Sequence, residues 1–306
     1  MNSAGTPSAA AANAPRSALA AVLTSAGELA GAIASEPALV LLDVRWKLGQ
    51  PDGRERYEQG HIPGAVFVEM ESELAAPPSP VAGRHPLPPL GALQAAARRW
   101  GIRQDSTVVV YDDNGNQAAA RAWWLLRWGG LTRVTMLDGA LAAWREAGGP
   151  LQVGFVAALP GDVVLSGGAL AVIDADEAAE LPARGVLLDA RAAERYRGET
   201  EPIDPRAGHI PGATSAPTTE NLSAEGTFRG RDELRERFRA LGVDGAAPVA
   251  VYCGSGVTAA HEIAALAIAG FDAALYPGSW SQWASDPARP VAVGEREGTA
   301  AAGSAS

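Results

Sequence analysis

The chain alternates short apolar runs with longer segments whose apolar residues recur at helical spacing. The apolar runs are residues 38–42, 107–111, 134–137, 186–188, 248–252 and 273–276. The helical segments between them are residues 90–100, 118–128, 232–240 and 259–269. Unbroken apolar runs of this length are typical of strands buried on both faces, and helices between them indicate crossover connections. The pattern predicts an α/β fold with a central parallel sheet flanked by helices.

The same pattern occurs twice along the chain. Four motifs recur in the same order in the two halves. They are Leu-Leu-Asp-Xaa-Arg at residues 41–45 and 187–191, Gly-His-Ile-Pro-Gly-Ala at 60–65 and 208–213, a valine-containing run ending at Asp112 and at Cys253, and a glycine followed five residues later by tryptophan at Gly139 and Gly278. Four ordered matches indicate a tandem duplication of a domain of about 130 residues.

The repeat also suggests where the parts of the chain begin and end. The expected parts are a disordered N-terminal tail at 1–18, a first domain at 19–150, a linker at 151–168, a second domain at 169–295 and a C-terminal tail at 296–306. The first tail is small and polar, which favours disorder, and the linker contains Gly and Pro.

Composition narrows the class of protein. Apolar residues make up 47% of the 306 residues and charged residues 20%, which is typical of a soluble globular protein. The net charge of -10 argues against nucleic acid or an anionic membrane as a partner. No apolar run approaches the roughly 20 residues that span a bilayer, and the first 18 residues lack a signal peptide's apolar core. One cysteine cannot form an intrachain disulfide, so we expect a cytoplasmic protein.

The single cysteine, Cys253, lies between a predicted strand and a predicted helix. Ligands of parallel sheets bind at such carboxyl ends of strands. The segment between the cysteine and the helix is Gly254, Ser255, Gly256, Val257 and Thr258. Its glycines allow backbone N–H groups to point inward, and the helix N-terminus adds partial positive charge, so the loop favours a nucleophilic thiolate. The alternative is a small buried apolar side chain.

The duplication separates these two interpretations. The residue corresponding to Cys253 in the first half is Asp112, so the first domain keeps the architecture and lacks the nucleophile. We expect a catalytically silent first domain that forms one wall of the site. An arginine six positions after the cysteine, which phosphatase loops require, is replaced by Ala259. Four scattered histidines and one cysteine do not supply a metal site, and no cofactor is expected.

These motifs resemble the two-domain rhodanese-type sulfurtransferases over roughly residues 19 to 295. The loop Cys-Gly-Ser-Gly-Val-Thr-Ala at 253–259 is similar to that of 3-mercaptopyruvate sulfurtransferases, whereas thiosulfate sulfurtransferases resemble Cys-Arg-Lys-Gly-Val-Thr-Ala. Thiosulfate is a dianion, which cations in the loop would stabilise, and this loop has none. An arginine fork outside the loop would suffice for monoanionic mercaptopyruvate.

The resemblance implies a reaction and two substrate-binding residues. The Cys253 thiolate attacks the sulfur of mercaptopyruvate, pyruvate leaves as its enolate, and loop amides hold the Cys253 persulfide. Arg191 and Arg197 match arginines that bind the carboxylate and carbonyl of the donor. A thiol acceptor, such as thioredoxin or a small thiol, or cyanide in an assay, then takes the outer sulfur.

The resemblance also implies a proton relay in which Ser255 acts with His61 and Asp52 of the first domain. His61 has an alternative interpretation, because its motif recurs at His209 and a structural turn would explain both. Two other functions stay open: a thiosulfate:cyanide sulfurtransferase, and a non-catalytic persulfide carrier or sensor. A carrier needs no carboxylate-binding arginines.

Overall fold

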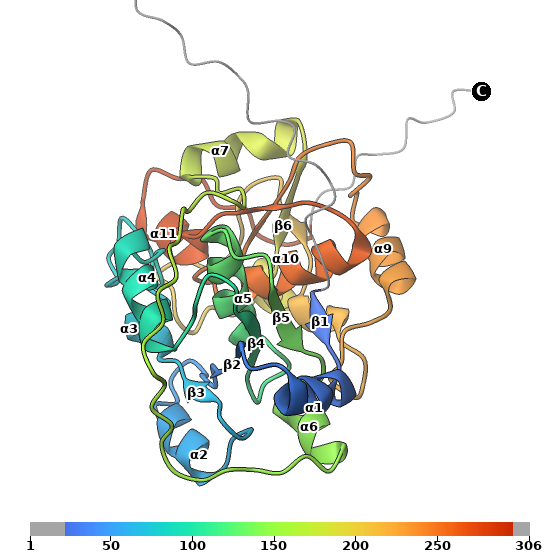
Figure 1. The fold of residues 1–306 in the computed structure, drawn as a ribbon. Helices are drawn as coiled ribbons and strands as arrows, with labels where there is room; N and C mark the ends of the chain where they lie inside the picture. Colours follow the sequence, from blue (N-terminus) through green and yellow to red (C-terminus); the bar gives the residue numbers. More distant parts are fainter. Residues whose placement is uncertain (1–21, 296–306) are drawn as a thin grey trace, which may run out of the picture.

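The computed structural model describes residues 22–295, and the tails expected at 1–18 and 296–306 lie outside this range. Two parallel sheets form the centre of the molecule (Figure 1). The first has the order β1-β5-β4-β2-β3, formed by Leu23–Thr24, Val134–Leu137, Thr107–Tyr111, Leu39–Asp43 and Val66–Phe67. The second has the order β7-β6-β8-β9, formed by Thr214–Ser215, Val186–Asp189, Val249–Tyr252 and Ala274–Leu275. All strand pairs in both sheets are parallel, which confirms the predicted fold class.

Helices connect and cover the strands. Those of the first half are α1 (Ala26–Ser35), α2 (Gly53–Gln59), α3 (Met70–Glu73), α4 (Leu90–Arg99), α5 (Ala119–Trp128) and α6 (Ala140–Glu146). Those of the second half are α7 (Ala175–Glu180), α8 (Ala193–Tyr196), α9 (Arg231–Ala240), α10 (Thr258–Ala269) and α11 (Ser279–Ser285). Short 3-10 turns occur at Leu181–Ala183 and Thr218–Asn221. Between α6 and α7 the chain runs as a long extended segment along one edge of the molecule (Figure 1).

The two halves share a packing arrangement around the duplicated motifs. In the first, Tyr57 stacks on His61 with ring centroids 4.0 Å apart, and in the second Tyr196 stacks on His209 at 3.7 Å. Each histidine donates from Nδ1–H to the backbone carbonyl oxygen of the tyrosine on which it stacks. The Gly-His-Ile-Pro-Gly-Ala motif is therefore a structural turn in both halves.

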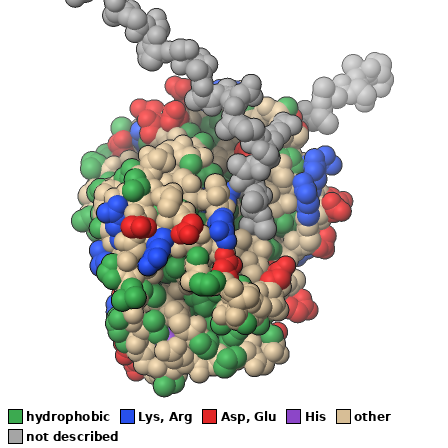
Figure 2. All heavy atoms as spheres, viewed as in Figure 1, with side chains coloured by type: hydrophobic (Ala, Val, Ile, Leu, Met, Phe, Trp, Pro, Cys, Tyr) green, Lys and Arg blue, Asp and Glu red, His purple; other side chains and the backbone are tan. Residues whose placement is uncertain are grey.

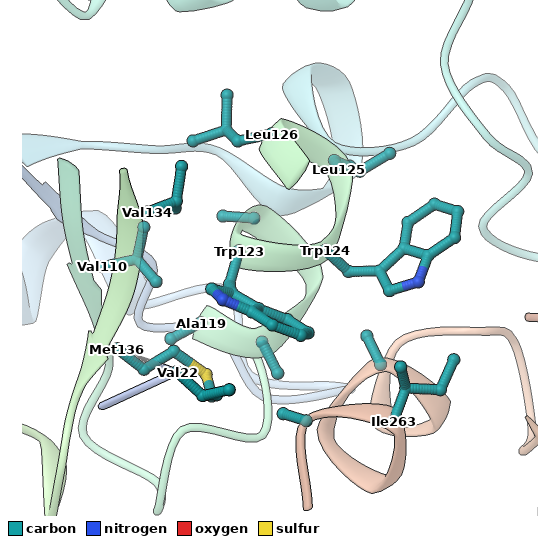
Figure 3. Close-up of a cluster of buried hydrophobic side chains, with 14 of the residues drawn as sticks. Val22, Val110, Ala119, Trp123, Trp124, Leu125, Leu126, Val134, Met136 and Ile263 are labelled. Atoms are coloured by element: carbon teal, nitrogen blue, oxygen red, sulfur yellow. The ribbon is translucent and has the colours of Figure 1, made fainter. Parts of the chain in front are cut away.

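The halves are joined by a continuous apolar core. Helices α5 and α10 pack against each other, and their buried residues belong to one cluster that reaches into both sheets. Figure 3 shows Trp123 of α5 lying against Val22 and Met136 beside the first sheet, with Ile263 of α10 on the neighbouring helix. Burial of a Trp or Ile side chain contributes about 2–3 kcal/mol or more, so this interface fixes the domains relative to each other.

The surface shows no broad patch of one charge on the face in Figure 2, where acidic and basic side chains alternate. Within residues 22–295, no helix has the length and apolar character that crossing a membrane would require.

Candidate active site between the two domains

Cys253 lies directly after β8, at the carboxyl end of the second sheet, and is 1% exposed. Its Sγ accepts hydrogen bonds from the backbone N–H of Gly256 at 3.1 Å and of Ser255 at 3.5 Å. Gly256 has φ +80°, and a Cβ there would lie 2.7 Å from the Pro277 carbonyl oxygen, so the tight loop requires glycine. The sequence prediction of inward-pointing amides around the sulfur agrees with this geometry.

The first domain shows what such a loop holds when the cysteine is replaced. Asp112, the counterpart of Cys253, is fully buried, and its carboxylate accepts four backbone N–H bonds. The donors are Asn114, Asn116, Ala118 and Ala119, at 2.8 to 3.1 Å. The loop after this strand is therefore an anion cradle in both domains. In the second domain the same loop directs its N–H groups at the sulfur of Cys253.

A chain of hydrogen bonds reaches the cradle from the first domain. The Ser255 hydroxyl lies 2.7 Å from Nδ1 of His85, and Nε2 of His85 lies 3.1 Å from Glu71. Because a carboxylate only accepts, Nε2 carries the proton and Nδ1 is free to accept from Ser255. Burial lowers the pKa of His85, and the charge of Glu71 opposes this shift in part. The neutral imidazole is the form that accepts a proton from Ser255.

Arg121 of α5 forms hydrogen bonds to both the loop that contains His85 and the loop that contains Cys253. It is fully buried and donates to the carbonyl oxygens of His85 at 2.9 Å and Gly256 at 3.1 Å. It also donates to Leu74 and Pro86. Burial lowers its pKa to about 10, although interaction with Cys253 opposes this shift in part. A buried cation thus lies beside the Cys253 loop and joins the two domains.

The cradle opens into a cavity of about 280 Å³ between the domains. Its walls come from both halves. They include Trp46, Leu48, Arg84 and Gln117 from the first, and Arg191, Arg195, Thr218, Cys253, Gly254, Ser255, Val257 and Thr258 from the second. A volume of this size suits a small organic acid.

Arg195, at the end of α8, lies over the cradle. A methyl group at position 254 would be 3.5 Å from its Nη1. The first domain again supplies a comparison, because Arg56 precedes Tyr57 as Arg195 precedes Tyr196. Arg56 forms an ion pair with Asp113, the residue that corresponds to Gly254. The second domain has a glycine where the first has a carboxylate, and here Arg195 faces the cavity above Gly254.

The structure corrects the expected relay partners of Ser255. His61 is buried in the structural turn of the first domain, where Nδ1 bonds to Tyr57 and the ring stacks on it. Asp52 lies at the N-terminus of α2 and pairs with Arg56 at 3.2 Å. The histidine against Ser255 is His85.

The two arginines expected to bind the donor, Arg191 and Arg197, lie in different surroundings. Arg191 lines the cavity, but its three nitrogens donate to Asp189, to the Gly208 carbonyl and to Glu201. Its counterpart Arg45 makes matching bonds to Asp43 and Gly60 in the domain without a nucleophile, so this arrangement is structural.

Arg197 lies outside the cavity lining. It is partly exposed and pairs with Glu199 at 2.7 Å and with Glu295 at 3.5 Å. Within this segment, Arg195 is the arginine that faces Gly254.

The duplication held a signal for the residues that sequence reasoning missed. His61 and Arg191 each have an identical counterpart in the other half, His209 and Arg45. Both pairs make the same structural hydrogen bonds in the two domains. His85 lies in the loop at 74–89 and has no histidine counterpart in the second half. A titratable residue present in only one copy is the better candidate for chemistry that only one site performs.

The Rhodanese-like domain family matches the chain twice, over residues 25–147 and 174–286. The chain belongs to this family, as a tandem pair of rhodanese-like domains. The crystal structure of SseA from Escherichia coli, a 3-mercaptopyruvate sulfotransferase in its description, superposes with a TM-score of 0.76 at 35% identity, covering 85% of this chain and 99% of that one.

Two sequence relatives carry names for different sulfur donors. A Pseudomonas aeruginosa protein named for 3-mercaptopyruvate sulfurtransfer is 49% identical over 283 residues, covering 89% of this chain and 98% of that protein. SseB of Mycobacterium tuberculosis, named for thiosulfate sulfurtransfer, is 50% identical over 279 residues. The match covers 89% of this chain and 97% of that protein. The predicted sulfurtransferase family is confirmed, and the donor has to be argued from the site.

Proposed function

We propose that this protein is a 3-mercaptopyruvate sulfurtransferase that acts through a persulfide on Cys253. The thiolate attacks the donor sulfur, the carbon–sulfur bond breaks, and its electron pair leaves on carbon as the pyruvate enolate. The enolate takes up one proton, which balances the proton carried by the donor thiol. An acceptor thiolate then attacks the outer sulfur, forms its own persulfide and returns Cys253 as a thiolate.

The observation that carries the proposal is the relay of Ser255, His85 and Glu71 beside the sulfur. The proton of the donor thiol has to leave the sulfur and reach the enolate carbon. Ser255, hydrogen-bonded to the unprotonated Nδ1 of His85, can accept this proton as a general base and return it as a general acid, and such catalysis contributes about 10²- to 10⁴-fold. Transfer of sulfur from thiosulfate releases sulfite and requires no proton. A buried neutral histidine hydrogen-bonded to a serine in the cradle therefore fits mercaptopyruvate.

The donor carboxylate is placed by Arg195, in the position that Asp113 occupies beside Arg56 in the first domain. The cradle amides of Ser255 and Gly256 stabilise the persulfide. Since the loop 254–258 contains no Arg or Lys, charge recognition depends on this neighbouring guanidinium.

The test is a comparison of kcat/KM for mercaptopyruvate and thiosulfate with the wild type and with Ser255→Ala. We expect the wild type to prefer mercaptopyruvate, and Ser255→Ala to lose about 10²-fold or more with that donor while thiosulfate turnover changes little. A wild type that prefers thiosulfate tenfold would contradict the donor assignment. So would an equal loss with both donors.

The second candidate, a thiosulfate sulfurtransferase, is favoured by the name of the M. tuberculosis relative. The same comparison decides between the two. A persulfide carrier without turnover is a third possibility, and it would accept sulfur while releasing no pyruvate from mercaptopyruvate.

We also propose a thiol acceptor, such as thioredoxin or a small thiol, and a cytoplasmic location. A second hollow of about 170 Å³ adjoins the main cavity and shares Trp46, Leu48, Gln117, Val257 and Thr258 with it, which would suit an acceptor that approaches from this side. The single cysteine fits a reducing compartment. Single-turnover transfer from the isolated persulfide to thioredoxin, compared with a small thiol, tests the acceptor: a sulfur that neither thiol removes would contradict it.

A further inference from the structure

A cluster of charged residues from both domains lies at the edge of the cavity. Arg84 comes from the loop at 74–89 of the first domain, directly before His85, and Arg195 comes from α8 of the second. Asp204 pairs with both, through Arg84 Nη1 and, at 3.2 Å, through Arg195 Nη2. Glu201 accepts a further bond from Arg195 at 2.6 Å. One carboxylate therefore bridges two guanidinium groups across the domain interface.

The two arginines face the cavity and the carboxylate does not. Arg84 and Arg195 line the cavity together with Cys253, whereas Asp204 lies behind them with 4% of its side chain exposed. A methyl group at position 254 would be 2.9 Å from Arg84 Nη2 and 3.5 Å from Arg195 Nη1. Nη2 of Arg84 and Nη1 of Arg195 thus both lie close to Gly254, the residue after Cys253.

Some donors of this pair are unused. Nε of Arg84 and Nε of Arg195 are buried and have no hydrogen-bond partner within residues 22–295. Buried guanidinium nitrogens without partners are costly, and an anion bound above Gly254 would bring acceptors close to this pair. The first domain fills the corresponding place with the carboxylate of Asp113.

The cluster has no net charge. The two positive charges of Arg84 and Arg195 are balanced by the two negative charges of Asp204 and Glu201, and Arg191, which also contacts Glu201, is balanced by Asp189. It presents directed N–H donors to an anion without an excess of positive charge. This favours a planar monoanionic carboxylate, which is recognised by paired hydrogen bonds, over a dianion, which needs a compensating charge.

We propose that Arg84 is a second donor-binding residue and that Asp204 determines donor specificity by neutralising the Arg84–Arg195 pair. The inference rests on the proposed function for the identity of the carboxylate donor. Its charge argument applies to any two donors that differ in charge. Removal of the Asp204 charge leaves the pair with an excess positive charge and shifts preference toward the dianion.

The experiment measures kcat/KM for thiosulfate relative to mercaptopyruvate in wild type, Asp204→Asn and Glu199→Gln. The asparagine keeps an acceptor for the arginines. Glu199→Gln is the matched control, because it removes one carboxylate that pairs with Arg197 outside the cavity. We expect Asp204→Asn to raise the thiosulfate-to-mercaptopyruvate ratio about tenfold, with a steeper fall of thiosulfate turnover with salt, and the control to leave the ratio unchanged.

An unchanged ratio in Asp204→Asn, or an equal rise in the control, would overturn the role of Asp204. Arg84→Met tests the pair without altering Asp204: we expect KM for mercaptopyruvate to rise about tenfold, and an unchanged KM would overturn donor binding by Arg84. These outcomes are distinct from failure of the proposed function, which shows as a thiosulfate preference of the wild type. The change in ratio between variants is measured whichever donor the wild type prefers.

Discussion

Arg121 offers the most direct test of how the two domains build one site. Its guanidinium donates to His85 at 2.9 Å and Gly256 at 3.1 Å, and more weakly to Leu74 and Pro86. We consider Arg121→Met, which keeps the length of the side chain and removes all of its donors. A buried carbonyl left without a donor costs about 1–3 kcal/mol, so the two shorter bonds alone predict a loss of about 2–6 kcal/mol. Total stabilities of about 5–15 kcal/mol make this a large fraction.

The assay is urea unfolding followed by tryptophan fluorescence, because Trp123 and Trp124 are on the same helix as Arg121. The control is Arg98→Met, which removes one hydrogen bond to the Val163 carbonyl away from the cavity. It should cost about 0.5–1.5 kcal/mol and leave turnover normal. Sulfur transfer by Arg121→Met should fall as well, since the loops of His85 and Cys253 lose their common anchor. An unfolding midpoint and turnover equal to the wild type would refute the reasoning.

Three other predictions concern protons and backbone. Because Glu71 raises the pKa of His85 against the effect of burial, Glu71→Gln should move the acidic limb of the mercaptopyruvate kcat/KM profile to lower pH, and an unmoved limb would argue against the relay. Burial lowers the pKa of His261 from 6.5 to about 4, so its contribution to stability is present above pH 6.5 and is lost as pH falls toward 4. The loss is about 3 kcal/mol by linkage, and pH-dependent unfolding of His261→Gln should lack it. Gly256→Ala should abolish turnover through its contact with the Pro277 carbonyl, whereas Gly226→Ala, with φ +78° and open space, should retain it.

Much of the fold could be predicted because local pattern and tertiary environment agree. The runs at 107–111 and 134–137 are strands with those bounds, β4 and β5, since each is apolar enough to be buried on both faces. The two-residue strands β1, β3 and β7 were not predicted, because a strand so short has no periodicity of its own. Their pairing depends on the neighbouring strand.

The site was only partly predictable for a related reason. Cys253 and the loop that surrounds its sulfur are contiguous in sequence, between a strand and a helix. Their arrangement therefore depends on local sequence and could be predicted from it. His85 reaches Ser255, and Arg84 reaches Gly254, only because the loop at 74–89 packs on the second domain. One contact of this packing is the hydrogen bond from the Arg84 backbone N–H to the Ser281 hydroxyl, at 3.0 Å. Such contacts depend on the orientation of the domains. The choice between Arg195 and Arg197 depends likewise on which side of a short helical turn faces the cavity.

The central claim is that Cys253 carries the sulfur between donor and acceptor. Mass spectrometry of the intact protein after exposure to mercaptopyruvate, with pyruvate release followed in parallel, tests it in the wild type and in Cys253→Ser. We predict that the wild type gains the mass of one sulfur atom on the peptide containing Cys253, with about one pyruvate released per chain, and that a thiol acceptor removes the added mass. Cys253→Ser should gain nothing and release no pyruvate. Pyruvate release by Cys253→Ser at the wild-type rate, or sulfur bound elsewhere in the wild type, would contradict the account.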